Sequence, residues 1–159
     1  MILVLLGTCA HGFERLAKAV EDFARQSRED VLIQMGCTSG RLAGVRSFDF
    51  VPHDELLSMI EKADLIIAHG GFATLGECLD FRKRIVAVPR KKEYGETLDS
   101  GLGQEEIVRQ LEKEGKVIGV YDIRELPEAI ERARVFQPPG GPHSHIPELV
   151  RRFVRSVFS

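Results

Sequence analysis

The sequence predicts an α/β fold in which helices flank a parallel sheet. Short, largely continuous apolar runs alternate with segments of helical periodicity along the first 135 residues. Continuous apolar runs are typical of strands buried on both faces, and strands that alternate with helices join by right-handed crossovers into a parallel sheet. The chain has 159 residues, of which 43% are hydrophobic, and this is enough for one domain with a sizeable core.

Six segments have the pattern of strands. The first apolar run ends at Gly7, the second at Gly36 and the fifth at Pro89, residue types that commonly terminate a strand. The predicted strands are residues 2–6, 31–35, 48–51, 65–68, 85–88 and 117–120.

Five segments are predicted to be helices. In the first, apolar residues recur at helical spacing from Phe13 to Ala24 and form one stripe. Asp54 is positioned to cap the second helix, with Pro52 at its boundary, and Gly115 is positioned to terminate the fourth. The predicted helices are residues 13–24, 54–60, 74–81, 104–114 and 126–135, with a polar loop over residues 90–103.

Residues 1–136 are interpreted as one α/β domain, followed by a linker and a C-terminal helix. Residues 137–145 read QPPGGPHSH and lack any periodicity, which is typical of a linker. Residues 146–159 carry an apolar stripe with arginines beside it, the pattern of an amphipathic helix. This helix either folds back on its own domain or docks on a partner chain or a membrane surface.

Composition and charge exclude several classes of protein. There are 22 Lys and Arg against 24 Asp and Glu, a net charge of −2, so nucleic acid is not an expected partner. Cys9, Cys37 and Cys78 are odd in number and lack CxxC spacing, which disfavours disulfides and a zinc site and suits the cytoplasm. The apolar runs are shorter than the roughly 20 residues of a membrane span, and the first is too short for a signal peptide. Because no cluster of carboxylates stands out, no metal ion is expected.

The segment after the fourth predicted strand is the most informative one for function. In open parallel sheets, ligands bind beyond the carboxyl ends of the strands. The sequence there is His69-Gly70-Gly71-Phe72-Ala73-Thr74, and glycines between a strand and a helix let backbone N–H groups and the helix dipole face an anion. The segment is not GxGxxG and does not follow the first strand, which disfavours a dinucleotide site of the Rossmann type. A purely structural turn remains the alternative.

Glu77 lies one helical turn after Thr74 and is a candidate ligand for a ribose diol, because a carboxylate can accept two hydrogen bonds. The alternative is a capping box, since Thr74 and Glu77 have the T-x-x-E spacing of that motif.

The turn after the first predicted strand is a second candidate for phosphate binding. Gly7 and Thr8, with Gly12 ahead of the first helix, either face a phosphate or form a tight connection. His11 and His69 are candidates for an acid or base near neutral pH, although a single histidine after a strand is more often structural. Cys9 has no evident base other than His11, which disfavours it as a nucleophile.

Taken in order, these motifs resemble a known family. The chain is similar to the C-terminal domain of family 28 glycosyltransferases over residues 2–135, in particular to the short stand-alone form of bacterial exopolysaccharide synthesis. It also resembles the catalytic subunit of the two-subunit UDP-N-acetylglucosamine transferase of lipid-linked oligosaccharide synthesis. The residues that carry the resemblance are Gly7-Thr8, 13–16, 63–71, Glu77, 88–90, 94–96 and 104–105.

The resemblance implies a Rossmann-like C-terminal half of a GT-B glycosyltransferase whose donor substrate is a UDP-sugar, with no further cofactor. Uracil would lie against the backbone at Val51, within the segment from Phe50 to Pro52, and the ribose would meet Glu77. The diphosphate would meet the turn at Gly7 and Thr8 and the turn from Gly70 to Thr74. The hydroxyls of the sugar would meet Gln104 and Glu105.

Two departures from the family pattern bear on activity. Family members usually carry Gly-Glu-His and then His-Gln in the loop, whereas this chain has Gly95-Glu96-Thr97 and Gly103-Gln104. A catalytically silent subunit that binds a nucleotide sugar or serves as a scaffold is therefore the alternative. A sugar-nucleotide epimerase shares the architecture, but a chain of 159 residues is short for that two-domain enzyme.

The resemblance also implies a partner. The acceptor-binding half is not part of this sequence, so a separate membrane-associated subunit would hold a lipid-linked acceptor and supply the catalytic base. Docking of residues 146–158 on that subunit would recruit this cytoplasmic chain to the inner face of the membrane. The expected reaction is transfer of N-acetylglucosamine or a related hexose from its UDP-sugar.

Overall fold

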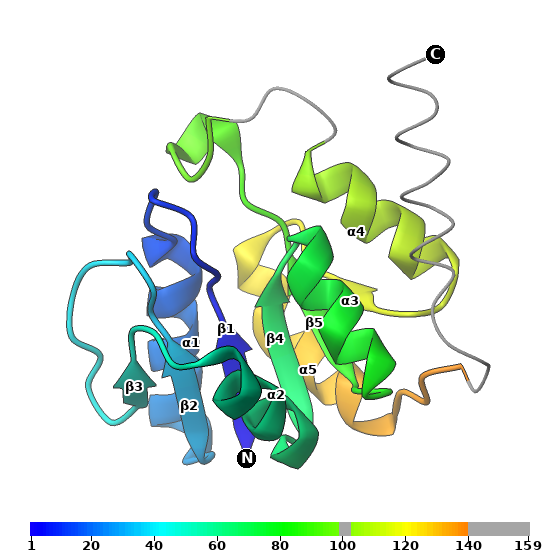
Figure 1. The fold of residues 1–159 in the computed structure, drawn as a ribbon, viewed down its shortest axis with the longest axis horizontal. Helices are drawn as coiled ribbons and strands as arrows, with labels where there is room; N and C mark the ends of the chain where they lie inside the picture. The colour runs from blue at the N-terminus through cyan, green and yellow to red at the C-terminus, as the bar shows by residue number, and fades with distance from the viewer. Residues whose placement is uncertain (99–102, 140–159) are drawn as a thin grey trace.

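The computed structural model describes residues 1–98 and 103–139, and in this part of the chain six parallel strands form one sheet in the order β3-β2-β1-β4-β5-β6 (Figure 1). The predicted α/β class with a parallel sheet is confirmed. The strands are β1 (Ile2–Leu5), β2 (Val31–Gln34), β3 (Arg46–Phe48), β4 (Leu65–His69), β5 (Ile85–Val88) and β6 (Ile118–Gly119).

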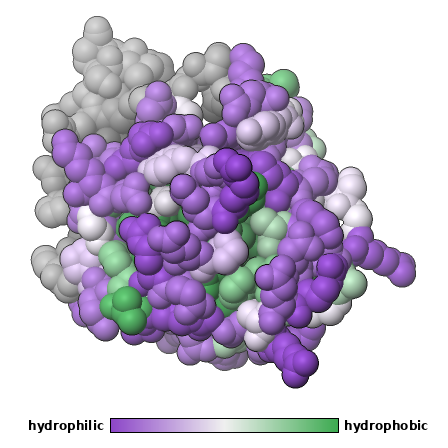
Figure 2. All heavy atoms as spheres, turned by 180° about the vertical axis from the view of Figure 1, so that it is seen from behind, coloured by the Kyte–Doolittle hydropathy of each residue, from purple (hydrophilic) through white to green (hydrophobic). Residues whose placement is uncertain are grey.

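Helices cover both faces of the sheet. The helices are α1 (Glu14–Ser27), α2 (His53–Lys62), α3 (Phe72–Asp80), α4 (Gln104–Lys113) and α5 (Leu126–Val135), with 3₁₀ turns η1 (Lys92–Tyr94) and η2 (Ile123–Glu125). One apolar cluster joins α1 and α5 to one face, and a second joins α2, α3 and α4 to the other (Figure 1). The surface seen from behind that view is mostly hydrophilic, with smaller hydrophobic areas between the polar residues and at the rim (Figure 2).

The central strand shows why continuous apolar runs predicted this architecture. Ile2 and Val4 on β1 pack toward α1 and α5, whereas Leu3 and Leu5 pack toward the other helical layer. All four side chains are buried, because a strand between two helical layers has no solvent-facing side.

Three predicted boundaries were wrong, each for a local reason. The third strand is Arg46–Phe48 rather than residues 48–51, because an edge strand with exposed Arg46 and Ser47 carries little apolar signal. Asp54 lies in the first turn of α2 and does not cap it, since Pro52 is the N-cap residue. Helix α3 begins at Phe72, two residues before the predicted start.

Helix α1 continues to Ser27, three residues beyond the predicted end, and the prediction missed residues 25–27 because they carry no apolar residue of the stripe. The remaining helical boundaries agree closely with the sequence. Helix α5 has the predicted bounds, and α4 ends before Gly115, whose φ of +69° is the left-handed conformation expected after a helix. The polar loop contains η1, while its residues 99–102 lie outside the described part. The predicted C-terminal helix and most of the linker, residues 140–159, lie outside it as well.

The topology places the switch point of the sheet at the carboxyl ends of β1 and β4. From β1 the chain proceeds through β2 to β3 on one side, and then crosses to β4 on the other side of β1. Ligands of open α/β sheets bind at such a switch point. Within residues 1–98 and 103–139, no helix has the length and apolar character that crossing a membrane requires.

Candidate functional site

The ends of β1, β2 and β4 pack closely against one another at the switch point because glycines lie there. Gly7, after β1, has a φ of +83°, and a Cβ there would lie 2.5 Å from His69 Nε2 at the end of β4. A Cβ on Gly36, after β2, would lie 2.3 Å from the carbonyl oxygen of Gly7. These contacts exclude a side chain at either position, so the two glycines serve close packing in addition to any role in anion binding.

His69 is held inside this junction. Its Nδ1 accepts a hydrogen bond from the Gly71 N–H (3.0 Å), and its Nε2 lies 3.2 Å from Thr74 Oγ1. An accepting Nδ1 places the ring proton on Nε2, which then donates to the hydroxyl. Burial and, next, the charge of Arg90 lower the pKa of His69 to about 4. The ring is uncharged at neutral pH with both nitrogens engaged, which favours a structural role over acid–base chemistry.

The capping-box alternative for Thr74 and Glu77 was wrong. Gly71 is the N-cap residue of α3, so Thr74 is the third residue of the helix and its hydroxyl is bonded to His69. Glu77 is partly exposed, at 31%, and its Oε1 lies 3.5 Å from Nε2 of His53 at the start of α2. Its carboxylate therefore reaches the segment that follows β3, which includes the half-buried Val51.

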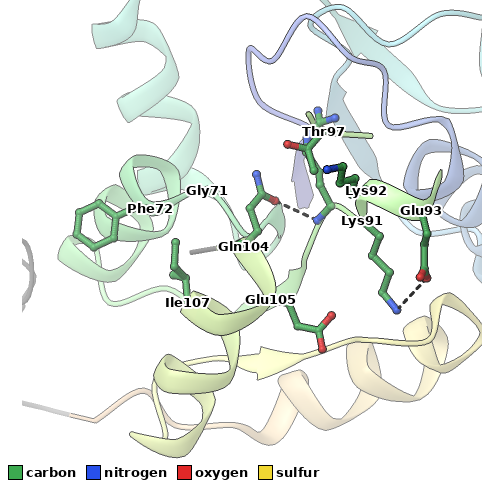
Figure 3. A pocket seen from close by; sticks show the side chains of 11 residues that line it. Gly71, Phe72, Lys91, Lys92, Glu93, Thr97, Gln104, Glu105 and Ile107 are labelled. Carbon is green, nitrogen blue, oxygen red and sulfur yellow. Dashed lines mark hydrogen bonds and ion pairs between the residues drawn. The ribbon is translucent and has the colours of Figure 1, made fainter. Parts of the chain in front are cut away.

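A pocket of about 440 Å³ opens between the first turns of α3 and α4 and the segment after β5 (Figure 3). Four predicted site residues line it, and the structure brings these together although α3 and α4 begin 32 positions apart in sequence (104 − 72). They are Gly71, Phe72, Gln104 and Glu105. The other lining residues were not predicted as site residues: Arg90, Lys91, Lys92, Glu93, Thr97, Gly103 and Ile107.

The remaining predicted site residues lie around this pocket without lining it. His69, Gly70, Ala73 and Thr74 form the end of β4 and the first turns of α3. Gly7 and an exposed Thr8 follow β1, and Val51 and Glu77 meet near the start of α2, as described above.

The pocket favours an anion. Helices α3 and α4 both direct their N-termini at it, and unpaired N–H groups and the macrodipole make such ends partly positive. Lys91 and Lys92 add cationic side chains, although Lys91 Nζ also lies 3.9 Å from Glu93 Oε1. Glu93 and Glu105 line the pocket as well, against Arg90, Lys91 and Lys92. Glu106 Oε2 also accepts the Gly103 N–H at the start of α4 (2.5 Å), so these carboxylates offset part of the positive charge.

Gln104 joins the ends of β4 and β5 at the floor of this region (Figure 3). Its Oε1 accepts a hydrogen bond from the backbone N–H of Arg90 (3.1 Å), and its Nε2 lies 3.3 Å from His69 Nδ1. A Cβ on Gly70 would lie 2.7 Å from Gln104 Cβ, so α4 approaches the strand end closely only because residue 70 is glycine.

Glu105 presents its carboxylate at the pocket while an arginine holds one of its oxygens. Arg109, one turn later, donates to Glu105 Oε1 through Nε (3.1 Å) and Nη2 (2.6 Å). The Arg109 guanidinium lies 4.0 Å from the centre of the Tyr121 ring, which fixes its own position. Glu105 is therefore oriented by Arg109 of α4, which Tyr121 beyond β6 holds in place.

Arg90 is the central residue that sequence reasoning missed. It is 4% exposed, and its guanidinium donates to four carbonyl oxygens at 2.7–3.1 Å, three of them at either end of the β1–α1 turn. They belong to Leu6, His11, Gly12 and Glu96. Among the described residues, Arg90 Nε has no acceptor, and the guanidinium lies 4.7 Å from the centre of the Phe13 ring. The signal available in the sequence was the Val88-Pro89-Arg90 part of the family resemblance.

The cysteines and His11 show no arrangement that indicates chemistry. The backbone of His11 binds Arg90, and Cys9, Cys37 and Cys78 are free thiols. In the part of the chain that the structure describes, no three side chains of His, Cys, Asp or Glu gather as metal ligands, and the expectation of a metal-free site stays a prediction.

Comparison with known proteins identifies the family. The model of the glycosyltransferase family 28 C-terminal domain matches residues 1–135. The chain belongs to this family. No curated protein matches it in sequence.

Solved structures similar to this family 28 chain are GT-B glycosyltransferases. The calicheamicin glycosyltransferase CalG4 superposes with a TM-score of 0.62 at 19% identity, covering 99% of this chain and 37% of that one. MurG from Acinetobacter baumannii gives a TM-score of 0.57 at 14% identity, covering 96% and 49%. The glycotransferase of kitacinnamycin gives 0.61 at 18% identity, covering 84% and 34%. The fold is thus that of a GT-B C-terminal domain, and the chain spans between a third and a half of these proteins.

Proposed function

We propose that this chain is the donor-binding part of a glycosyltransferase. It moves a sugar, N-acetylglucosamine or a related hexose, from a UDP-sugar to a lipid-linked acceptor, and a partner subunit supplies the acceptor site. The observation that carries the proposal is the convergence of two helix N-termini and two lysines on one pocket beside the switch point of the sheet. Membership of family 28 supports sugar transfer as the class of reaction.

The donor lies along the carboxyl edge of the sheet. Its uracil rests against the backbone at Val51, and its ribose diol donates to Glu77, which reaches the adjacent start of α2. The diphosphate meets the turn at Gly7 and Thr8 and the first turn of α3. The diphosphate enters the pocket at the side lined by Gly71 and Phe72, and the sugar occupies the side at α4, where Glu105 accepts hydrogen bonds from its hydroxyls.

In the reaction, the acceptor hydroxyl attacks the anomeric carbon as the bond from that carbon to the diphosphate oxygen breaks. UDP leaves with the electron pair of this bond. The N-termini of α3 and α4, with Lys91 and Lys92, stabilise the negative charge that develops on the diphosphate. The proton of the acceptor hydroxyl passes to a base on the partner, since His69 is buried with both ring nitrogens engaged.

The proposed partner is a membrane-associated subunit that holds the acceptor. The chain covers 34–49% of the similar structures, so their remaining part lies outside the matched region. The assignment of the acceptor site to a separate subunit rests on the resemblance to the two-subunit transferase. Residues 146–158 dock on this subunit and recruit the chain to the cytoplasmic face of the membrane. The bacterial exopolysaccharide pathway is the proposed setting, from the resemblance alone.

A calorimetric titration with UDP and UDP-N-acetylglucosamine tests donor binding by the chain itself. We expect saturable binding of both, and no detectable heat with either would remove the basis of the proposal. Transfer to a lipid acceptor is then measured with and without the co-expressed partner. Full-rate turnover by the isolated chain would contradict the requirement for a partner.

A catalytically silent donor-binding subunit is the second candidate. Thr97 and Gly103 stand where the family usually has histidine, and both line the pocket. If the complex binds the UDP-sugar but transfers no sugar, and restoring Thr97→His and Gly103→His gives turnover, the silent subunit is the correct description.

A further inference from the structure

The segment after β5 is fastened to the turn after β1 by three buried or half-buried charged residues, Arg15, Arg90 and Glu96, which we call the clamp. Arg15 donates from Nε to Glu96 Oε1 (2.8 Å) and from Nη2 to Glu96 Oε2 (2.9 Å). Arg90 donates from Nη1 to the backbone carbonyl of Glu96 (2.9 Å). Glu96 is 3% exposed, so its carboxylate oxygens find their hydrogen-bond partners within the protein.

The clamp reaches both walls of the proposed donor site. On the pocket side, Glu96 precedes Thr97, and its Oε2 also accepts the N–H of Lys91 (2.8 Å). On the phosphate side, Arg90 binds the carbonyls of Leu6, His11 and Gly12. One polar network therefore connects the residues that face the sugar to the residues that face the diphosphate and sets the distance between them.

The contacts of Arg90 also orient the turn. A trans peptide group holds its N–H opposite to its C=O. Because the carbonyls of Leu6 and His11 point at the buried guanidinium, the N–H groups of Gly7 and Gly12 point away from it. The carboxylate of Glu14 lies against Gly12 at the α1 end of the turn, so Glu14 and Glu96 together balance the charges of Arg15 and Arg90. The outward N–H groups are therefore what favours an anion on the outer side of the turn.

We propose that Arg15, Arg90 and Glu96 are positioning residues for donor binding: they hold the β1–α1 turn with its N–H groups outward and keep it in register with the pocket. They act through other groups and do not touch the donor. This proposal rests on the proposed function, because the ligand it concerns is a nucleoside diphosphate. The contacts that join the β1–α1 turn to the segment after β5 are present without any ligand.

The test uses Glu96→Gln, which keeps the shape of the side chain and removes its charge, and Arg15→Lys as the conservative variant. Glu29→Gln is the matched control, because it removes the charge from an ion pair with Arg134 on the far side of α1, away from the clamp. Amide hydrogen exchange without ligand should be at least tenfold faster in residues 6–13 and 89–98 of Glu96→Gln. The control should leave both segments unchanged. Faster exchange in only one segment would overturn the link between them.

Ligand affinity then separates positioning from stability. We expect Glu96→Gln to weaken UDP binding at least tenfold and to change uridine binding, followed by chemical-shift titration, by less than twofold. Arg15→Lys should retain part of the UDP affinity. Unchanged UDP affinity, or an equal loss for UDP and uridine, would overturn the positioning role. If the unaltered chain binds no UDP, the proposed function and the positioning role both fail, while the exchange result still decides whether the clamp links the two segments.

Discussion

Glu77 of α3 and His53 of α2 meet across the carboxyl edge of the sheet, with 3.5 Å between Oε1 and Nε2. The two residues are 24 positions apart in sequence (77 − 53). Along the chain, α2 precedes β4 and α3 follows it. Through this contact the carboxylate of Glu77, in the middle of α3, lies beside the segment that follows β3. A ribose diol bound there would lie between the proposed uracil and diphosphate positions.

Replacing Glu77 by Gln should weaken UDP binding by about ten- to one-hundredfold, because a hydrogen bond to a charged acceptor contributes about 1.5–3 kcal/mol. Calorimetric titration of UDP measures this change. His53→Gln should have a smaller effect, since His53 is 65% exposed and contacts Glu77 rather than the ligand. A Glu77→Gln protein that binds UDP as tightly as the unaltered chain would leave the ribose without its proposed ligand.

Replacing Gly70 by Ala should destabilise the fold by about 1–3 kcal/mol, because the added Cβ would lie 2.7 Å from Gln104 Cβ and α4 must move to accept it. Urea unfolding measures the loss. In Gly44→Ala the new Cβ meets no atom within 4 Å, and its φ of +74° alone costs about 1–2 kcal/mol. Gly70 is not among the glycines with positive φ, so a loss there comes from the contact with Gln104. No measurable loss in Gly70→Ala would show that α4 does not depend on close approach at residue 70.

The sheet could be predicted from the sequence because burial on both faces leaves a direct signal. Leu3 and Leu5 on one face and Ile2 and Val4 on the other make an uninterrupted apolar run, as expected of a central parallel strand. The edge strand β3 has no such signal, since Arg46 and Ser47 are exposed, and its position was wrong by two residues at the start.

The site could be predicted only in part. Glycines after strands identified the turns, because a tight turn between a strand and a helix often requires glycine at one position, and this requirement is visible in the sequence itself. Arg90 and Glu96 gave no such signal: their roles arise from contacts with residues 6–15, more than 70 positions away in sequence. Lysines at the pocket were equally hidden, since a charged residue in a polar loop is usually only solvated.

The stability of the fold should fall as the pH is lowered from 6.5 toward 4, through His69. Its pKa is lowered to about 4 in the folded chain, from 6.5 when exposed, so the unfolded chain binds the extra proton in this range and is favoured by acid. One pKa unit corresponds to about 1.4 kcal/mol, which gives a loss of about 2 kcal/mol at pH 5 relative to pH 8. Urea unfolding of the chain and of His69→Gln at both pH values isolates this contribution. If both proteins lose the same free energy, His69 is not the group responsible.

Replacing Lys92 by Gln should weaken UDP binding severalfold and reduce the dependence of that affinity on salt. Lys92 lines the pocket beside two helix N-termini, where its charge adds to theirs, and its exposure lets dissolved ions screen the attraction. Titrations at about 50 mM and 300 mM salt measure both effects. Lys113→Gln removes the same charge at the opposite, C-terminal end of α4, where a cation favours the helix but faces no pocket residue. Its UDP affinity should match that of the unaltered chain, and a loss as large as that of Lys92→Gln would mean that overall charge, rather than the pocket, attracts the diphosphate.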